Sequence, residues 1–310
     1  MFKRLLVPLD ETPRDGEALA VARELARRSG ASIVLMHVEQ PITDLPAVVE
    51  ASQSMKRHLS ALRDAGIDAR SFVGFGEPVH KIAESAVHER PDLIIMAPHR
   101  RAWLDAIRHP SVTVRMLAHA EAPVLVWPEH LLARDVLSSL SAPAAGVLVP
   151  LDGSELAERA LPFATRLAHE FVRPLLLLRV VTPVTVAGAG PYTTQVKLAA
   201  QGNELREART YLGGIRKQLA RETDLTVESM VLHGSPSREL VRIAGSHAGS
   251  VMVLSTHGRN GFMRALLGSV AADLVRESPI PVFVIPPRAW QERPSGATAA
   301  VGAEEPVARG

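Results

Sequence analysis

The chain of 310 residues contains one sequence pattern twice, and this duplication constrains its fold more than any other feature. Residues 4–19 align with residues 146–161, which places Asp10 opposite Asp152, 142 positions later. Two domains are therefore expected, in agreement with the usual allowance of roughly 150 residues for a domain.

The later part of the repeat is spaced more widely. Residues 76–96 align with residues 234–254 at a distance of 158 positions, so the second copy carries 16 extra residues before this point. The stretch 182–195 is rich in glycine, proline and threonine, which is typical of a longer loop.

Each copy alternates between short aliphatic runs and helical stretches. Runs such as residues 5–9, 33–38 and 93–96 have the length and continuous apolarity of buried parallel strands. Five strands and four helices in strict alternation predict an α/β fold, a doubly wound five-stranded parallel sheet in each copy. Pro123 and Pro281 precede the last strand of each copy, which favours an edge position because proline cannot donate to a central ladder.

The starts of the first helices follow from their polar residues. Thr12, Pro13 and Asp15 predict an N-cap, a first-turn proline and a capping-box acid in the first copy. Ser154 is the expected N-cap in the second copy.

The expected domain boundaries come from composition. Residues 1–130 form the first domain, residues 131–144 a linker with a serine-, alanine- and proline-rich end, and residues 145–290 the second domain. Residues 291–310 have no hydrophobic periodicity and are expected to form a disordered tail.

Composition and charge exclude several classes of protein. The formal net charge is only +2, with acids interleaved among the bases, so no basic stripe indicates nucleic-acid binding. The first apolar run stops at Asp10, and residues 175–186 are interrupted by Arg179 and Pro183, so neither a signal peptide nor a membrane helix is expected. A cytoplasmic protein is therefore predicted.

The absence of cysteine excludes disulfides and thiolate metal sites. The histidines are scattered along the chain and lack the spacing of metal ligands.

In a doubly wound sheet, ligands bind beyond the carboxyl ends of the strands where the strand order reverses. In the second copy these turns contain Asp152, the loop 255–261 and the small residues Gly268 and Ser269 at a helix start. Small residues let backbone N–H groups approach an anion, and a helix amino terminus adds further amides, so a polyphosphate is the expected ligand. Asp152 could accept hydrogen bonds from a sugar or a base, or it could cap the first helix of its copy.

The residues "VPLDGSELAERAL" (149–161), "HGSP" (233–236) and "STHGRNGFMRALLGSVAADLVRESPIPVFVI" (255–285) resemble the universal stress protein (UspA-like) family. Because the resemblance covers both copies, the chain looks like a tandem member. This implies two flavodoxin-like domains, similar to adenine nucleotide alpha hydrolases, paired as a pseudo-dimer through their edge strands.

The family's nucleotide signature is Gly, two residues, Gly, nine residues and Gly-Ser or Gly-Thr. Here Ser255 takes the place of the first glycine, Gly258 is the second, and Gly268 with Ser269 closes the pattern. The resemblance implies that adenine and ribose are held near Pro150, Asp152 and Val180. It implies phosphate contacts for Ser255, Thr256, His257, Gly258, Arg259, Asn260, Gly261, Gly268, Ser269 and Val270. The implied ligand is ATP, with any Mg²⁺ carried by its phosphates.

The first copy departs from this signature. Arg100 replaces the glycine equivalent to Gly258, and Pro110, which has no N–H, replaces the glycine equivalent to Gly268. We therefore expect no family-type ATP binding in the first domain. The basic cluster there (His99, Arg100, Arg101, Arg108 and His109) is either a solvated loop or a side-chain anion site.

The resemblance implies a stress-response role exerted through conformation or partners. No general base or water-positioning residue stands out, so catalysis is not expected, and any ATP hydrolysis would be slow. Two alternatives remain open, a nucleotide-independent interaction scaffold and a slow ATP hydrolase. The sequence also leaves open whether two chains form a homodimer.

Overall fold

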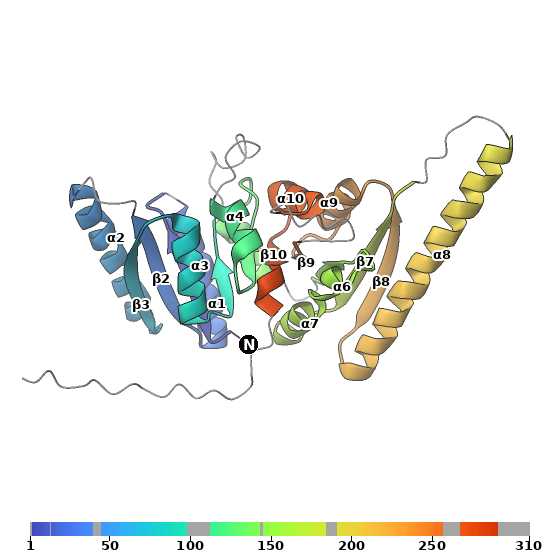
Figure 1. Ribbon diagram of the computed structural model, residues 1–310. Helices are drawn as coiled ribbons and strands as arrows, with labels where there is room; N and C mark the ends of the chain where they lie inside the picture. Colours follow the sequence, from blue (N-terminus) through green and yellow to red (C-terminus); the bar gives the residue numbers. More distant parts are fainter. Residues whose placement is uncertain are drawn as a thin grey trace, which may run out of the picture.

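One continuous sheet of ten strands runs through both halves of the chain (Figure 1). The computed structural model describes residues 2–12, 14–39, 45–97, 112–142, 145–183, 191–256 and 267–290. The strands of the first half are β1 (Arg4–Leu9), β2 (Ser32–Glu39), β3 (Ala69–Phe75), β4 (Leu93–Ile95) and β5 (Val124–Val126). Those of the second half are β6 (Val147–Pro150), β7 (Leu175–Val181), β8 (Val227–His233), β9 (Val251–Ser255) and β10 (Val282–Ile285).

The two halves meet at the middle of the sheet. The strand order is β3-β2-β1-β4-β5-β10-β9-β6-β7-β8, parallel within each half and antiparallel where β5 meets β10. Leu125 faces Phe283 at the centre of this junction, with a valine pair on each side. The predicted fold, two doubly wound five-stranded parallel sheets paired through their edge strands, is therefore confirmed.

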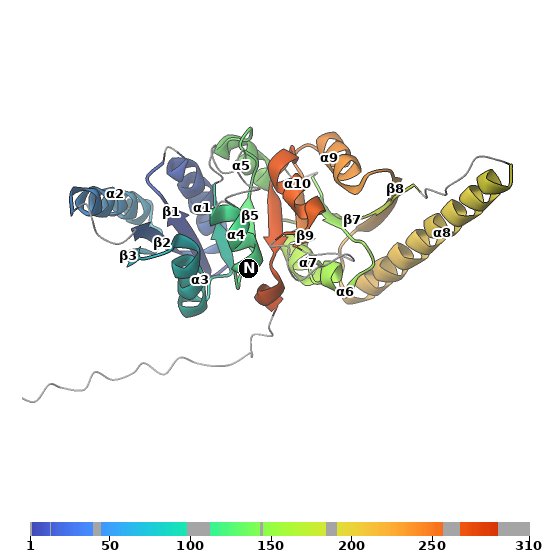
Figure 2. The same cartoon turned by 45° about the horizontal axis from the view of Figure 1, so that its top comes forward.

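Helices cover both faces of the sheet (Figure 2). The first half contributes α1 (Asp15–Ser29), α2 (Leu45–Asp64), α3 (Pro78–Glu89) and α4 (Val112–His119), followed by α5 (Ala133–Ser141). The second contributes α6 (Glu155–Glu158), α7 (Leu161–Glu170), α8 (Pro191–Glu222), α9 (Pro236–Ser246), α10 (Ser269–Glu277) and the 3₁₀ helix η2 (Pro287–Trp290). Buried residues of α1, α2, α5, α7 and α8 share one core, and those of α3, α4, α9 and α10 share the core on the opposite face.

The insertion in the second copy lengthens a helix. Helix α8 has 32 residues, whereas its counterpart α2 has 20, and the amino end of α8 extends well beyond the sheet (Figure 1). The expectation of a loop throughout residues 182–195 is wrong in its last part, because α8 begins at Pro191. Proline is well suited to a first helical turn, where its missing N–H has no intrahelical partner.

The two expected helix starts have different outcomes. Ser154 is the N-cap of α6, and its Oγ accepts a hydrogen bond from the Ala157 N–H at 3.1 Å, which confirms the prediction. The prediction for Thr12 is wrong, because α1 begins at Asp15 with Arg14 at the N-cap. The buried Asp15 carboxylate instead accepts hydrogen bonds from the preceding turn.

The segment expected as a linker contains the helix α5, which is attached to both halves. Arg28 of α1 donates to the Leu140 carbonyl at 3.1 Å, and Arg173, just before β7, donates to the Ser139 carbonyl at 2.6 Å. The expected tail, residues 291–310, lies outside the described residues. Within the described ranges, no helix combines the length and apolar character that crossing a membrane requires.

Candidate functional site

The strand order of the second half reverses between β6 and β9. From β6 the chain first pairs β7 on one side and later returns, through β8, to place β9 on the other side. Parallel strands end at the same edge, so the residues after β6 and those after β9 lie next to each other. Asp152 follows β6 and Ser255 ends β9, which brings two separate parts of the predicted site to this reversal point.

The turn after β6 is held by its own side chains. Pro150 ends the strand, and Asp152 Oδ1 accepts hydrogen bonds from the Ser154 N–H at 2.9 Å and from Ser154 Oγ at 2.6 Å. Gly153 between them has φ of 82°, in the left-handed region that favours glycine. Asp152 therefore supports the N-cap Ser154, and its carboxylate is fixed at the carboxyl end of β6.

The end of β9 is joined to the start of α10. Thr256, only 1% exposed, donates its N–H to the Ile285 carbonyl at 3.3 Å and accepts the Gly268 N–H at 2.9 Å. Gly268 is the N-cap of α10 with φ of −62° and ψ of 147°, and Ser269 and Val270 form the first turn. The Gly268 amide therefore anchors α10 beside β9. The phosphate contact that the resemblance implies for Gly268 stays a prediction.

Val180 and Val270 lie on one face of the sheet. Both are partly buried and pack against the core shared by α9 and α10. Val180 belongs to β7 and Val270 to α10, so these two predicted site residues approach the strand ends from different elements.

Part of the predicted site lies outside the described residues. This applies to His257, Gly258, Arg259, Asn260 and Gly261, for which the phosphate contacts stay a prediction. It also applies to residues 98–111 of the first half, which include Arg100, Pro110 and the basic cluster.

Comparison with known proteins identifies the family. The family model described as "Universal stress protein family" matches residues 1–128 and again residues 146–286. The chain belongs to the universal stress protein family. Its two matches account for most of the chain, so this is a tandem universal stress protein, as the sequence resemblance implied.

Individual relatives agree with this assignment. A universal stress protein of Methanocaldococcus jannaschii is 30% identical over 146 residues, which are 45% of this chain and 80% of the relative. One from Mycolicibacterium smegmatis is 32% identical over 147 residues, 47% of this chain and 49% of the relative. The archaeal relative is thus matched over most of its length by about half of this universal stress protein, whereas the match covers only about half of the Mycolicibacterium relative.

Solved structures show the same fold over nearly the whole chain. A universal stress protein from Archaeoglobus fulgidus superposes with a TM-score of 0.66 at 20% identity, covering 92% of this chain and 98% of the other. A protein of unknown function from Pseudomonas aeruginosa gives 0.60 at 20% identity and 93% coverage of both chains.

The equivalent turn in the first half of this universal stress protein is built differently. Glu11 occupies the position of Gly153 and has the same left-handed backbone, with φ of 65°. The Asp15 carboxylate accepts hydrogen bonds from the Asp10 N–H at 3.2 Å and the Glu11 N–H at 2.7 Å. Burial, followed by the charge of Asp10, raises the pKa of Asp15 to about 7.

Sequence reasoning missed a group of residues beside the second turn. Arg179 of β7 lies beside Gly153 and over the ring of Tyr211 of α8, and the Tyr211 hydroxyl donates to Glu158 of α6. A signal was present, because Arg179 interrupts an aliphatic strand at the position where the first copy has His37. The contact with Tyr211 could be seen only in the structure.

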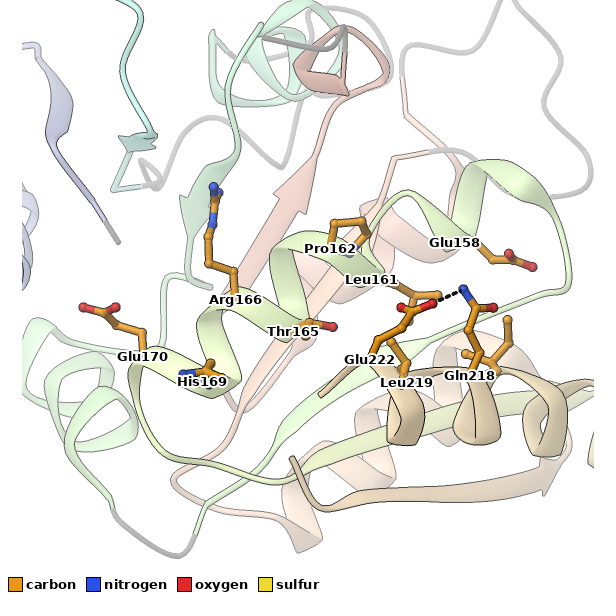
Figure 3. Close-up of a pocket in the computed structure, with 11 residues that line it drawn as sticks. Glu158, Leu161, Pro162, Thr165, Arg166, His169, Glu170, Gln218, Leu219 and Glu222 are labelled. Carbon is orange, nitrogen blue, oxygen red and sulfur yellow. Dashed lines mark hydrogen bonds between the residues drawn. The ribbon is translucent and has the colours of Figure 1, made fainter. Parts of the chain in front are cut away.

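A pocket among the described residues lies away from these strand ends. It is a groove of about 570 Å³ between α7 and α8, with an apolar floor that includes Leu161 and Leu219 (Figure 3). None of the predicted site residues lines it. Across the described part of the chain, no three carboxylate, histidine or cysteine side chains are grouped as a metal site.

Proposed function

We propose that the second half of this universal stress protein binds an adenine nucleotide, ATP, at the carboxyl ends of β6 and β9. The observation that supports the proposal best is the reversal of strand order between these strands, with the amino end of α10 fixed beside it. Such a reversal leaves a crevice outside the strand ends, and a helix amino terminus there favours a negatively charged ligand.

The two ends of the nucleotide would meet different elements. The turn of Pro150 and Asp152, together with Val180, would hold adenine and ribose. The amino end of α10, with Gly268 as its N-cap and Ser269 and Val270 in its first turn, would hold phosphate together with the loop 255–261. The N–H groups of Ser269 and Val270 have no intrahelical acceptor, so they could donate to the phosphate. A magnesium ion, when bound, would be carried by the phosphates.

The proposed role is that nucleotide binding changes how the protein contacts its partners during stress. Hydrolysis is not part of the proposal. The nucleotide-independent scaffold is the alternative that the following experiment distinguishes.

Equilibrium titration of ATP into three proteins tests the proposal: wild type, Gly268→Ala and Gly268→Pro. All three residues can adopt the φ of −62° observed at this position, but only proline removes the N–H that donates to Thr256. We expect wild type and Gly268→Ala to bind ATP with similar affinity. Gly268→Pro should bind about tenfold or more weakly, since loss of one anchoring hydrogen bond is worth about 1.4 kcal/mol.

Two results would count against the proposal. Wild type that does not bind ATP would overturn nucleotide binding and favour the scaffold. Equal affinity of the alanine and proline variants would overturn the role of Gly268, and Gly258→Arg would then show whether the phosphate loop is involved at all.

A further inference from the structure

We infer that Arg179 is a positioning residue for the adenosine end of the proposed nucleotide site. It acts through Gly153 on the turn that contains Asp152, and it is held in place by Tyr211 and Glu158. The inference rests on the proposed function and extends it, since Arg179, Tyr211 and Glu158 are not among the residues that the resemblance implies for the nucleotide site.

The first part of the argument is the contact between Arg179 and Gly153. A Cβ atom added at Gly153 would lie 2.5 Å from Nη1 of Arg179 and 3.3 Å from Cζ. The guanidinium therefore packs directly against the backbone of the turn, in space that any side chain at position 153 would fill. Because Gly153 also has φ of 82°, both the space beside the guanidinium and the backbone conformation favour glycine here.

The second part is the support behind Arg179. Its Cζ lies 5.2 Å from the centroid of the Tyr211 ring, which is within the range of a cation–π interaction. The Tyr211 hydroxyl donates to Glu158 Oε1 at 2.8 Å. Glu158 ends α6, the helix that starts at the turn itself, so the contacts lead from the turn through Arg179 and Tyr211 back to the element after the turn.

The electrostatics agree with this arrangement. Burial, followed by the hydrogen bond to Glu158, raises the pKa of Tyr211 well above its usual value. The charge of Arg179 opposes this shift and the charge of Asp152 adds to it, so both charged groups lie near the ring. Tyr211 therefore remains a neutral hydrogen-bond donor to Glu158 throughout the physiological pH range.

The first half provides an internal comparison. His37 stands where Arg179 stands, and its Nδ1 lies 3.0 Å from the Leu9 carbonyl while its Nε2 lies 3.1 Å from Glu39. Opposite it, Glu11 has a side chain where the second half has Gly153. Glycine and arginine thus occur together in the half proposed to bind nucleotide, and neither occurs at these positions in the other half.

The consequence for binding is preorganisation. A turn that is already fixed loses little conformational freedom when the ligand arrives, so less of the interaction free energy is spent on ordering it. Because the turn would meet the nucleoside and not the phosphates, removing Arg179 should weaken adenosine and ATP by the same factor.

The experiment uses the full chain with Arg179→Met, Arg179→Lys and Tyr211→Phe. Arg166→Met is the matched control, because Arg166 makes a similar cation–π contact with Phe163 at 5.6 Å on the neighbouring helix. Adenosine and ATP are titrated into each protein. Hydrogen exchange of the backbone amides of residues 152–158 is measured without ligand.

We expect Arg179→Met to weaken adenosine and ATP equally, by about tenfold, and to accelerate exchange in residues 152–158. Arg179→Lys should keep part of the ligand affinity and part of the protection from exchange, since lysine keeps the charge but not the planar group. Tyr211→Phe, which keeps the ring and loses the hydrogen bond to Glu158, should show a smaller effect in the same direction. The control should match wild type.

Unchanged affinity and exchange in Arg179→Met would overturn the inference while ATP binding by wild type still supported the proposed function. A loss confined to ATP would also overturn it, because Arg179 would then act on the phosphates. If wild type binds neither ligand, the proposed function is overturned. Faster exchange in Arg179→Met would in that case show that Arg179 only stabilises the structure.

Discussion

At the residue scale, the carboxyl group of Asp15 is a strongly perturbed acid of the first half. It is buried beside Asp10, and these two causes raise its pKa to about 7 from an ordinary value of 3.8. The equivalent position in the second half is Ala157, which does not titrate. The contribution of this carboxyl group to the free energy of unfolding therefore has no counterpart in the second half.

This asymmetry predicts a pH dependence. A native pKa above the unfolded value means that the native state binds the proton more tightly. The resulting stabilisation is complete below about pH 4 and is lost as the pH rises through 7. We expect wild type to lose on the order of 2 kcal/mol of unfolding free energy from this group between pH 5 and pH 8.

Asp15→Asn should remove that part of the pH dependence, because its amide does not ionise, while its one oxygen can still accept one of the two hydrogen bonds. Urea denaturation of both proteins at pH 5 and pH 8 measures the difference. Parallel changes in wild type and variant would show that Asp15 does not titrate in this range.

At the scale of elements, α5 is fastened to both halves at its carboxyl end. Arg28 and Arg173 each donate to carbonyl groups there, and Arg173 is only 4% exposed. Burial and the charge of Arg28 lower the pKa of Arg173, so the two cations oppose each other. The negative end of the α5 dipole and its last carbonyls, which have no donor within the helix, offset this repulsion.

Replacing Arg173 should therefore destabilise the protein. Arg173→Met leaves the Ser139 carbonyl without its charged donor, and we expect the free energy of unfolding to fall by about 2 kcal/mol. Arg27→Met is the control, because the Arg27 side chain is 68% exposed and pairs with Glu24 at the surface, where an ion pair contributes little to stability. Equal losses in chemical denaturation would contradict the role assigned to Arg173.

At the scale of the whole molecule, the shared sheet and an aromatic cluster connect the two halves. Phe163 lies 6.5 Å from Phe2 of the first half and 5.5 Å from Phe283 of β10, measured between ring centroids. All three side chains are buried. A mutation that destabilises one half is therefore expected to speed hydrogen exchange in the other half as well.

Phe283→Ala tests this connection. Loss of a buried aromatic side chain typically costs about 3–5 kcal/mol. We expect faster hydrogen exchange not only in β10 but also in β5, because Leu125 would lose its cross-strand neighbour. Phe72→Ala on β3, far from the junction, should leave β10 protected. Unchanged exchange in β5 would show that the halves open independently.

The sequence predicted the architecture well because the strands follow from local signals, their alternation with helices indicates a doubly wound sheet, and the family resemblance implies the pairing of the two halves. Aliphatic runs marked the buried strands, and Pro123 and Pro281 marked the two that meet at the junction. The prediction of Thr12 as the N-cap was wrong because a capping pattern does not reveal that Asp15 is buried and accepts hydrogen bonds from the preceding turn. The start of α8 was missed because its first residues have the composition of a loop.

The candidate site was predicted only in part, for a physical reason. Strand-end residues such as Asp152 and Ser255 follow from topology. The bond from Gly268 to Thr256 and the contact of Arg179 with Tyr211 depend on tertiary packing between residues distant in sequence, which no local pattern records.

The pairing of Leu125 with Phe283 has a consequence for the evolution of the fused chain. These residues are equivalent in the repeat and face each other across its approximate twofold axis. A symmetric homodimer would have to place the same residue on both sides of that axis, leucine on leucine or phenylalanine on phenylalanine. Covalent fusion removes this constraint, so a large side chain can be matched by a smaller one. The same release from symmetry allows the sequence of the first half to depart from the nucleotide signature at Arg100 and Pro110, where the second half has Gly258 and Gly268.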